Sequence, residues 1–73
     1  MGAMAIERGS LVGATTASGR VVTMRALGVP VRGRDFPVLW VCTEDEWVRA
    51  REAGEEPDGL PWPLEDVSEM TPA

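Results

Sequence analysis

The sequence predicts a small, mainly β domain with one helix, folded as an antiparallel partial barrel of four or five strands. Three observations favour this class: two β-rich stretches joined by a short turn, an apolar run without a polar member, and a helix-start signal directly after that run. A chain of 73 residues holds one domain with a small core, because a domain of this size buries only about 60% of its unfolded surface. We expect residues 5–70 to form this domain, residues 1–4 to be a disordered remnant of cloning, and residues 71–73 to be a disordered tail.

The first two strands are expected to form a β-hairpin. Residues 10–16 and 20–27 are rich in Val, Thr and Leu, and the short connection ASG separates them. In the second stretch, Val22 and Met24 fall on the same face because side chains alternate along a strand. We therefore place Val22 and Met24 in the core.

An exposed arm is expected after the hairpin. Residues 28–35, GVPVRGRD, contain two glycines and a proline, so the chain must turn here, with room for a brief extended piece at residues 29–32. The arm carries Arg32 and Arg34 and offers both to a partner.

The central strand is expected to follow this arm. Residues 38–42, VLWVC, include no polar side chain, so both faces of the strand should be covered. We expect the whole stretch 36–42 to be interior, with Val38, Trp40 and Cys42 in the core on one face.

One helix is predicted directly after the central strand. Thr43 as N-cap and Glu46 three residues later form a capping box, in which each side chain satisfies a backbone donor of the first turn. The helix should span residues 44–53 and end at Gly54, with Trp47 as its buried anchor. Two pairs have the i,i+4 spacing of ion pairs, namely Asp45 with Arg49 and Arg51 with Glu55.

The segment after the helix should be extended. Pro61 and Pro63 disfavour helix over residues 60–64, and a short last strand is expected over residues 66–70. Trp62 lies between the two prolines and has two interpretations. It is either a rigid docking residue for a partner or a lid that folds back over the core beside Trp47.

The charges are divided unevenly along the chain. Residues 1–43 carry five arginines and two acids, net +3, whereas residues 44–73 carry two arginines and ten acids, net −8. The two halves are therefore either complementary to each other in the fold, which is the simpler interpretation, or they present an acidic face to a basic partner. The acidic segment 44–69 also has the composition of a nucleic-acid mimic or of a solvated surface.

The composition argues against catalysis and metal binding. The chain has no histidine, lysine or tyrosine and no glycine-rich phosphate loop, so we expect neither an enzyme nor a cofactor. The single cysteine, Cys42, excludes an internal disulfide and, together with the missing histidine, a zinc site. The longest apolar run is too short to span a membrane, and we expect a cytoplasmic protein.

The order strand, strand, strand, helix, strand, with ERGSLV before a hairpin at ASGRVV, resembles that of small SH3-like barrels, including the KOW-type modules. A helix of about ten residues before the last strand departs from that pattern. The resemblance implies binding of a peptide or a nucleic acid through loops and one sheet edge.

We therefore expect a non-enzymatic interaction module, a small regulatory or accessory protein that binds a protein partner and can form a homodimer. The expected contact residues are Arg25, Arg32, Arg34 and Trp62, together with an exposed strand edge. The alternative is a nucleic-acid-binding module, in which Arg20 joins the other arginines along a phosphate backbone and Trp40 stacks on a base. The net charge of −5 and the expected burial of Trp40 oppose this alternative.

Overall fold

The computed structural model describes residues 6–70, so the predictions for residues 1–4 and 71–73 lie outside the described residues. The prediction of a mainly β fold with one helix is confirmed. The elements are β1 (Leu11–Thr15), β2 (Val21–Ala26), β3 (Val31–Arg32), β4 (Pro37–Thr43), α1 (Glu44–Ala53), β5 (Leu60–Pro63), the short 3-10 helix η1 (Leu64–Asp66) and β6 (Val67–Glu69).

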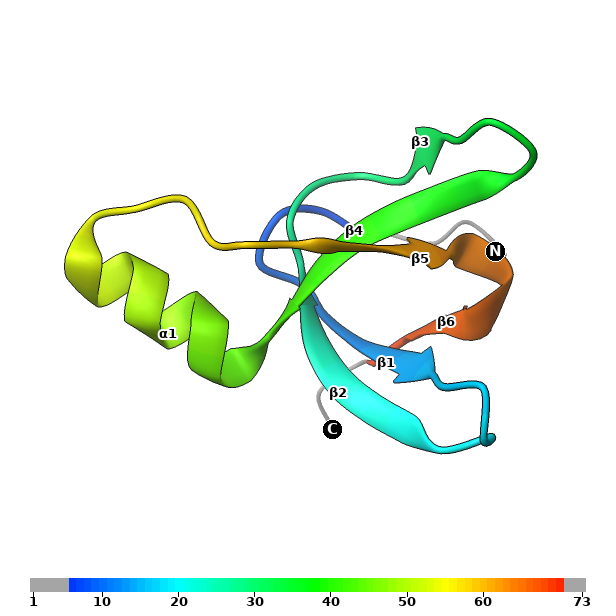
Figure 1. Ribbon diagram of the computed structural model, residues 1–73, viewed down its shortest axis with the longest axis horizontal. Helices are drawn as coiled ribbons and strands as arrows, with labels where there is room; N and C mark the ends of the chain where they lie inside the picture. The colour runs from blue at the N-terminus through cyan, green and yellow to red at the C-terminus, as the bar shows by residue number, and fades with distance from the viewer. Residues whose placement is uncertain (1–5, 71–73) are drawn as a thin grey trace.

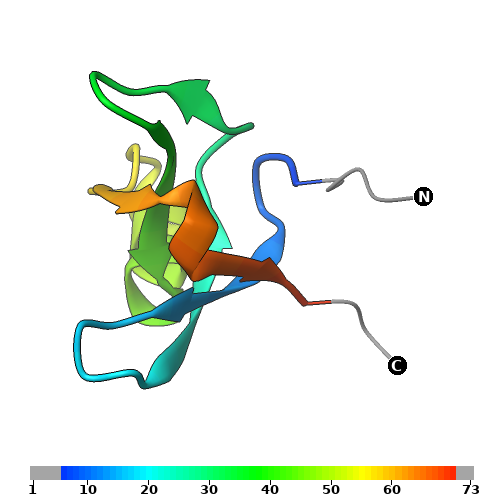
Figure 2. The ribbon, with the colours of Figure 1, turned by 90° about the vertical axis from the view of Figure 1, so that its right-hand side faces the viewer.

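The strands form one antiparallel sheet that curls into a half-barrel (Figures 1 and 2). Its order is β3-β4-β2-β1-β6, and β5 pairs with the other edge of β4. β1 and β2 form the expected hairpin, with Val12 opposite Met24 and Ala14 opposite Val22. β6 then pairs with β1, so the last strand of the described chain lies beside the first.

β4 is the central strand, as predicted, because it pairs with three others. Its C-terminal half pairs with β2, its N-terminal half pairs with β3, and its opposite edge pairs with β5. This arrangement needs a long strand, and β4 spans seven residues. The two-residue β3 and the separate β5 and β6 make the element order longer than the predicted one.

The core lies on the concave, inner face of the sheet. Leu39 and Val41 of β4 are fully buried there. Met24 is also buried, and Val22 and Trp62 are partly buried against the same cluster. The other buried members are Ile6, Val12, Ala14, Ala26 and Val67.

The outer face of β4 departs from the prediction. Trp40 is 45% exposed and Phe36 is 50% exposed, so the stretch 36–42 is not interior on both faces. Cys42 is buried near the end of β4, against which α1 packs, whereas Val38 is only partly buried. The physical reason is the direction of the helix. It leaves the end of β4 and projects beyond the sheet, away from the rest of β4 (Figure 1).

The helix begins and ends where the sequence predicts. The Thr43 side chain accepts a hydrogen bond from the Glu46 amide at 3.1 Å, and Gly54 ends the helix in the left-handed conformation with φ of 69°. Only half of the predicted capping box forms. The Glu46 carboxylate bonds to Arg49 and to the Asp58 amide instead of reaching back to Thr43.

The predicted i,i+4 ion pairs are also replaced. Arg49 pairs with Glu46 at i,i+3 and with Glu55, at 2.8 and 2.9 Å, and not with Asp45. The chain turns back directly after Gly54, and this turn brings Glu55 to Arg49 instead of Arg51.

Candidate interaction site

An open groove beside Trp40, which combines exposed apolar side chains with a charged pair, is the candidate site. Its volume is about 440 Å³, and we call it the Trp40 groove. Its lining comes from the start of the chain, the β2–β3 connection, β4 and the loop after α1. The lining residues used in the argument are Arg8, Leu27, Val29, Val31, Trp40, Glu56 and Gly59.

Apolar side chains in the Trp40 groove are open to solvent. Trp40 is 45% exposed, and Val29 and Val31 are 60% and 43% exposed. Register explains why they share a face. Val31 lies opposite Val38 across β3 and β4, and Val38 is two residues from Trp40 on the same side of β4. Contiguous exposed apolar surface of this kind commonly marks an interaction site.

Trp40 is held in place by its neighbours. Its carbonyl oxygen accepts the Leu27 amide at 2.8 Å, which fixes the backbone of β4 beside the β2–β3 connection. Gly59 lies against the ring, since a Cβ built there would be 3.5 Å from Trp40 Cε3 and would collide with Leu27 Cδ1. A side chain at residue 59 would therefore displace part of the groove wall.

The charged part of the groove is the pair Arg8–Glu56. Arg8 Nη2 lies 3.1 Å from Glu56 Oε1, and Arg8 Nη1 donates to the Leu27 carbonyl at 3.2 Å. Both side chains are at least half exposed, so the ion pair contributes little to stability. Its consequence is geometric, because it ties the loop after α1 to the opposite side of the groove.

Glu46 fixes the same loop from the helix. Its Oε2 accepts the Asp58 amide at 2.8 Å, and both of its carboxylate oxygens bond to Arg49. Arg49 also bonds to Glu55 at 2.9 Å. The hydrogen bonds from Arg49 and from the Asp58 amide lower the pKa of Glu46 to about 2, so this contact is fully charged at neutral pH.

Arg25, which from the sequence is expected to contact a partner, makes hydrogen bonds within the fold. It donates to both oxygens of Glu44, at 2.7 and 3.3 Å, and to the Gly9 carbonyl at 2.8 Å. The hydrogen bond to Arg25 lowers the pKa of Glu44. The guanidinium carbons of Arg25 and Arg8 lie 6.0 and 5.5 Å from the centroid of the Trp47 ring. Trp47 is partly buried and not fully buried as expected, and its ring makes cation–π contacts with both arginines.

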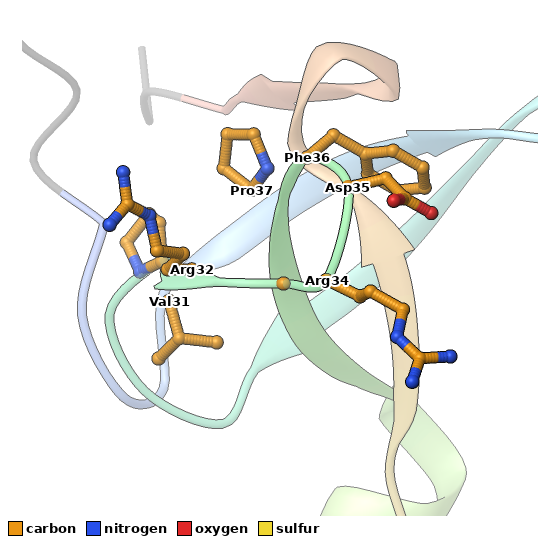
Figure 3. Close-up of a pocket in the computed structure, with 8 residues that line it drawn as sticks. Val31, Arg32, Arg34, Asp35, Phe36 and Pro37 are labelled. Atoms are coloured by element: carbon orange, nitrogen blue, oxygen red, sulfur yellow. The ribbon is translucent and has the colours of Figure 1, made fainter.

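The predicted arginine arm is a β-hairpin whose two arginines diverge. Residues 30–37 line a second hollow, and Figure 3 shows Arg32 and Arg34 pointing away from each other. Register places Arg32 on the face of β3 opposite to that of Val31. Neither arginine makes an ion pair within residues 6–70. Because they do not converge, they do not form one anion site.

Trp62 packs inward, as the lid interpretation expects. It is half-buried against the core, and its Nε1–H donates to the Thr15 carbonyl at 3.0 Å. It lies opposite Leu39 on the inner face and not beside Trp47, which lies at the other end of β4. The hydrogen bond links β5 to β1 across the half-barrel.

The edges of the sheet are poorly suited to binding a further strand. β5 pairs with β4, and two of its four residues, Pro61 and Pro63, have no N–H to donate. The outer strands β3 and β6 span only two and three residues. A partner is therefore expected to contact side chains on the outer face and not to extend the sheet.

Other kinds of site find little support in the described part of the chain. No three acidic or cysteine side chains within residues 6–70 gather where they could hold a metal ion. Burial raises the pKa of the Cys42 thiol, which keeps it protonated and unreactive at neutral pH. No helix in this part is long and apolar enough to cross a bilayer.

Comparison with known proteins does not assign a function. A scan of protein-family models finds no match to this chain, a search of curated proteins finds none, and a search of solved structures finds none. The function is therefore inferred from the groove itself.

Sequence reasoning missed most of this groove. No local sequence motif includes Arg8, Val29 or Glu56, and the sequence around Gly59 indicates only a turn. The signal that could have pointed to the site is Trp40 itself, because tryptophan is amphipathic and is often found at interfaces.

Proposed function

We propose that this protein is a non-enzymatic interaction module that binds a protein partner through the Trp40 groove. The observation that carries the proposal is the exposed tryptophan that lines, together with Val29 and Val31, a groove that no described element covers. Tryptophan is among the residues most enriched where interfaces concentrate their binding energy. The hydrogen bond from the Leu27 amide fixes the backbone at Trp40 and Gly59 lies against the ring, and this ordering before binding lowers the entropic cost of association.

The proposal is tested by comparing three serine variants. Proteins captured from the native host are purified, and their binding to the wild type is measured by titration. We expect Trp40→Ser to weaken binding by about tenfold or more. Val31→Ser should weaken it by a smaller factor.

Val48→Ser is the matched control, because Val48 is 43% exposed like Val31 but lies on α1, outside the groove. Its binding should equal that of the wild type. Equal binding by the wild type and Trp40→Ser would refute the proposal.

A nucleic-acid-binding module is the second candidate, and the exposure of Trp40 is the observation that favours it. An exposed ring beside Arg8 could stack on a base while the guanidinium contacts a phosphate. Glu56 in the same groove opposes a polyanion, so this candidate ranks second. Binding of single-stranded RNA or DNA that falls steeply with salt and is lost in Trp40→Ser would establish it over the first candidate.

A further inference from the structure

Arg8 is the fixed charged group of the Trp40 groove. Its Nη1 donates to the Leu27 carbonyl at 3.2 Å, and its guanidinium carbon lies 5.5 Å from the centroid of the Trp47 ring. Neither contact involves Glu56, which lies 3.1 Å from the other terminal nitrogen. Arg8 therefore keeps its position on the groove wall when Glu56 moves away.

Glu56 is the replaceable member of the pair. Its side chain is 85% exposed, against 50% for Arg8, and it bonds to the guanidinium through one oxygen only. An exposed ion pair of this kind contributes little free energy, so its release into water costs little. The loop does not depend on this contact, because the Asp58 amide donates to Glu46 at 2.8 Å and β5 begins shortly afterwards. Glu56 can therefore leave Arg8 while the groove walls stay in place.

We propose that Glu56 occupies the position of a partner's carboxylate. The Trp40 groove takes a short segment of another protein, in which an aspartate or glutamate replaces Glu56 on Arg8 and a neighbouring apolar side chain covers Trp40. This inference rests on the proposed function and specifies the chemistry of the partner. Charge complementarity carries it, because the chain itself places a carboxylate on Arg8 at this wall of the groove.

The Arg8 guanidinium has donors left for an incoming carboxylate. Within residues 6–70, its hydrogen bonds are one from Nη1 to Leu27 and one from Nη2 to Glu56. An arginine side chain carries further N–H groups and binds a carboxylate best through both oxygens. A partner's carboxylate can therefore bond to Arg8 more completely than Glu56 does.

A basic segment fits the same groove less well. A lysine or arginine of the partner would take Glu56 from Arg8 and leave the guanidinium, which Leu27 and Trp47 hold in place, without a counter-charge. An acid leaves only Glu56 unpaired, and that side chain is already largely hydrated. The segment should carry a single acid, because the net charge of −5 repels a polyanion.

The test uses a display library of short random peptides whose C-termini are blocked, so that only side chains supply a carboxylate. The library is selected on the wild-type protein after depletion on Trp40→Ser, and enriched peptides are synthesised as amides and titrated. We expect one aspartate or glutamate near an apolar residue, and binding to Trp40→Ser that is at least about tenfold weaker. Replacing that acid by its amide should weaken binding to the wild type about two- to fivefold, the range of an exposed ion pair.

Two variants of the protein test the exchange at Arg8. Glu56→Gln should bind the peptides about two- to fivefold more tightly, because the internal competitor has lost its charge. Glu52→Gln is the matched control, since Glu52 is an exposed acid on α1, outside the groove, and its affinity should match that of the wild type. In Arg8→Gln, the acidic peptide and its amide should bind equally well, a comparison made within one variant.

Peptides that require Trp40 but are basic or uncharged would overturn the inference and leave the proposed function standing. The same holds for a Glu56→Gln affinity no higher than that of Glu52→Gln, and for an acid-to-amide loss that persists in Arg8→Gln. A dimer of the free protein that sedimentation detects and that is lost in Trp40→Ser would show that the groove takes a second copy, which also overturns the inference. If no enriched peptide distinguishes the wild type from Trp40→Ser, both the inference and the proposed function fail.

Discussion

Trp62→Phe should destabilise the protein because it removes the donor that links β5 to β1. In the structure, Trp62 Nε1–H donates to the Thr15 carbonyl at 3.0 Å, and the ring packs against the core. Phenylalanine keeps an aromatic ring but has no N–H and is smaller. A lost hydrogen bond of this kind costs about 1 kcal/mol, and the smaller ring adds a packing loss, so we expect a total of about 1 to 2 kcal/mol.

Trp40→Phe is the matched control, because it makes the same chemical change one residue from Leu39, the pairing partner of Trp62. No hydrogen bond of the Trp40 ring is present within residues 6–70, and the side chain is 45% exposed, so we expect a change within about 0.5 kcal/mol. Thermal unfolding followed by far-ultraviolet circular dichroism measures both without relying on tryptophan fluorescence. For a domain of this size, Trp62→Phe should lower Tm by about 4 °C or more. Equal shifts for the two variants, or a larger one for Trp40→Phe, would refute the assignment of Trp62 as the link.

Two further predictions concern the loop after α1. Glu46→Gln should lower the stability of the protein at neutral pH, and the difference from the wild type should shrink on acidification. The reason is that the pKa of Glu46 is about 2 in the folded protein, below the ordinary 4.5. The stabilisation by the carboxylate is therefore complete above pH 4.5 and is lost as the pH falls toward 2. The measurement is the urea midpoint of the wild type and of Glu46→Gln between pH 7 and pH 2. A difference between the two midpoints that does not narrow as the pH falls would contradict the prediction. Gly59→Ala should cost about 1 kcal/mol or less, because its Cβ would collide with Leu27 Cδ1 and this partly buried side-chain end must turn aside. Gly28→Ala, where a Cβ meets nothing within 4 Å, should unfold at nearly the wild-type urea concentration, and equal losses in the two variants would count against this account of the groove wall.

The elements that could be predicted from the sequence are those specified by neighbouring residues. The helix limits follow from Thr43 and Gly54, whose effects act within one turn. The hairpin follows from alternation on both sides of a short turn. The extended geometry of β5 follows from Pro61 and Pro63, which restrict their own backbone and the residue before them.

The burial of Trp40 was predicted wrongly because it depends on the direction of α1, which the residues around Trp40 do not determine. An apolar strand predicts a cover for both faces, but the direction in which α1 leaves β4 decides what is covered. The helix protects Cys42 and leaves Trp40 open. No residue near Trp40 encodes that direction. The helix residue Trp47 contacts Arg8 and Arg25, which lie far from Trp40 in the sequence.

The division of charge was interpreted more successfully. Arg8 and Arg25 from the first half pair with Glu56 and Glu44 from the second, so the two halves are partly complementary in the fold. The other acids of the second half are spread over α1, the loop after it, η1 and β6. The composition is compatible both with two complementary halves and with an acidic face for a partner. The ion-pair distances in the structure show that the halves are partly complementary.

The pairing of β6 with β1 has a consequence for folding during translation. Val67 and Glu69 of β6 lie opposite Ala14 and Val12 of β1. One edge of β1, which is synthesised early, therefore stays unpaired until β6 has left the ribosome. The β1–β2 hairpin is therefore synthesised before the strand that pairs with its free edge, and such an edge can pair with other chains. The sheet can be completed at this edge only once residues Val67–Glu69 are available to pair with β1.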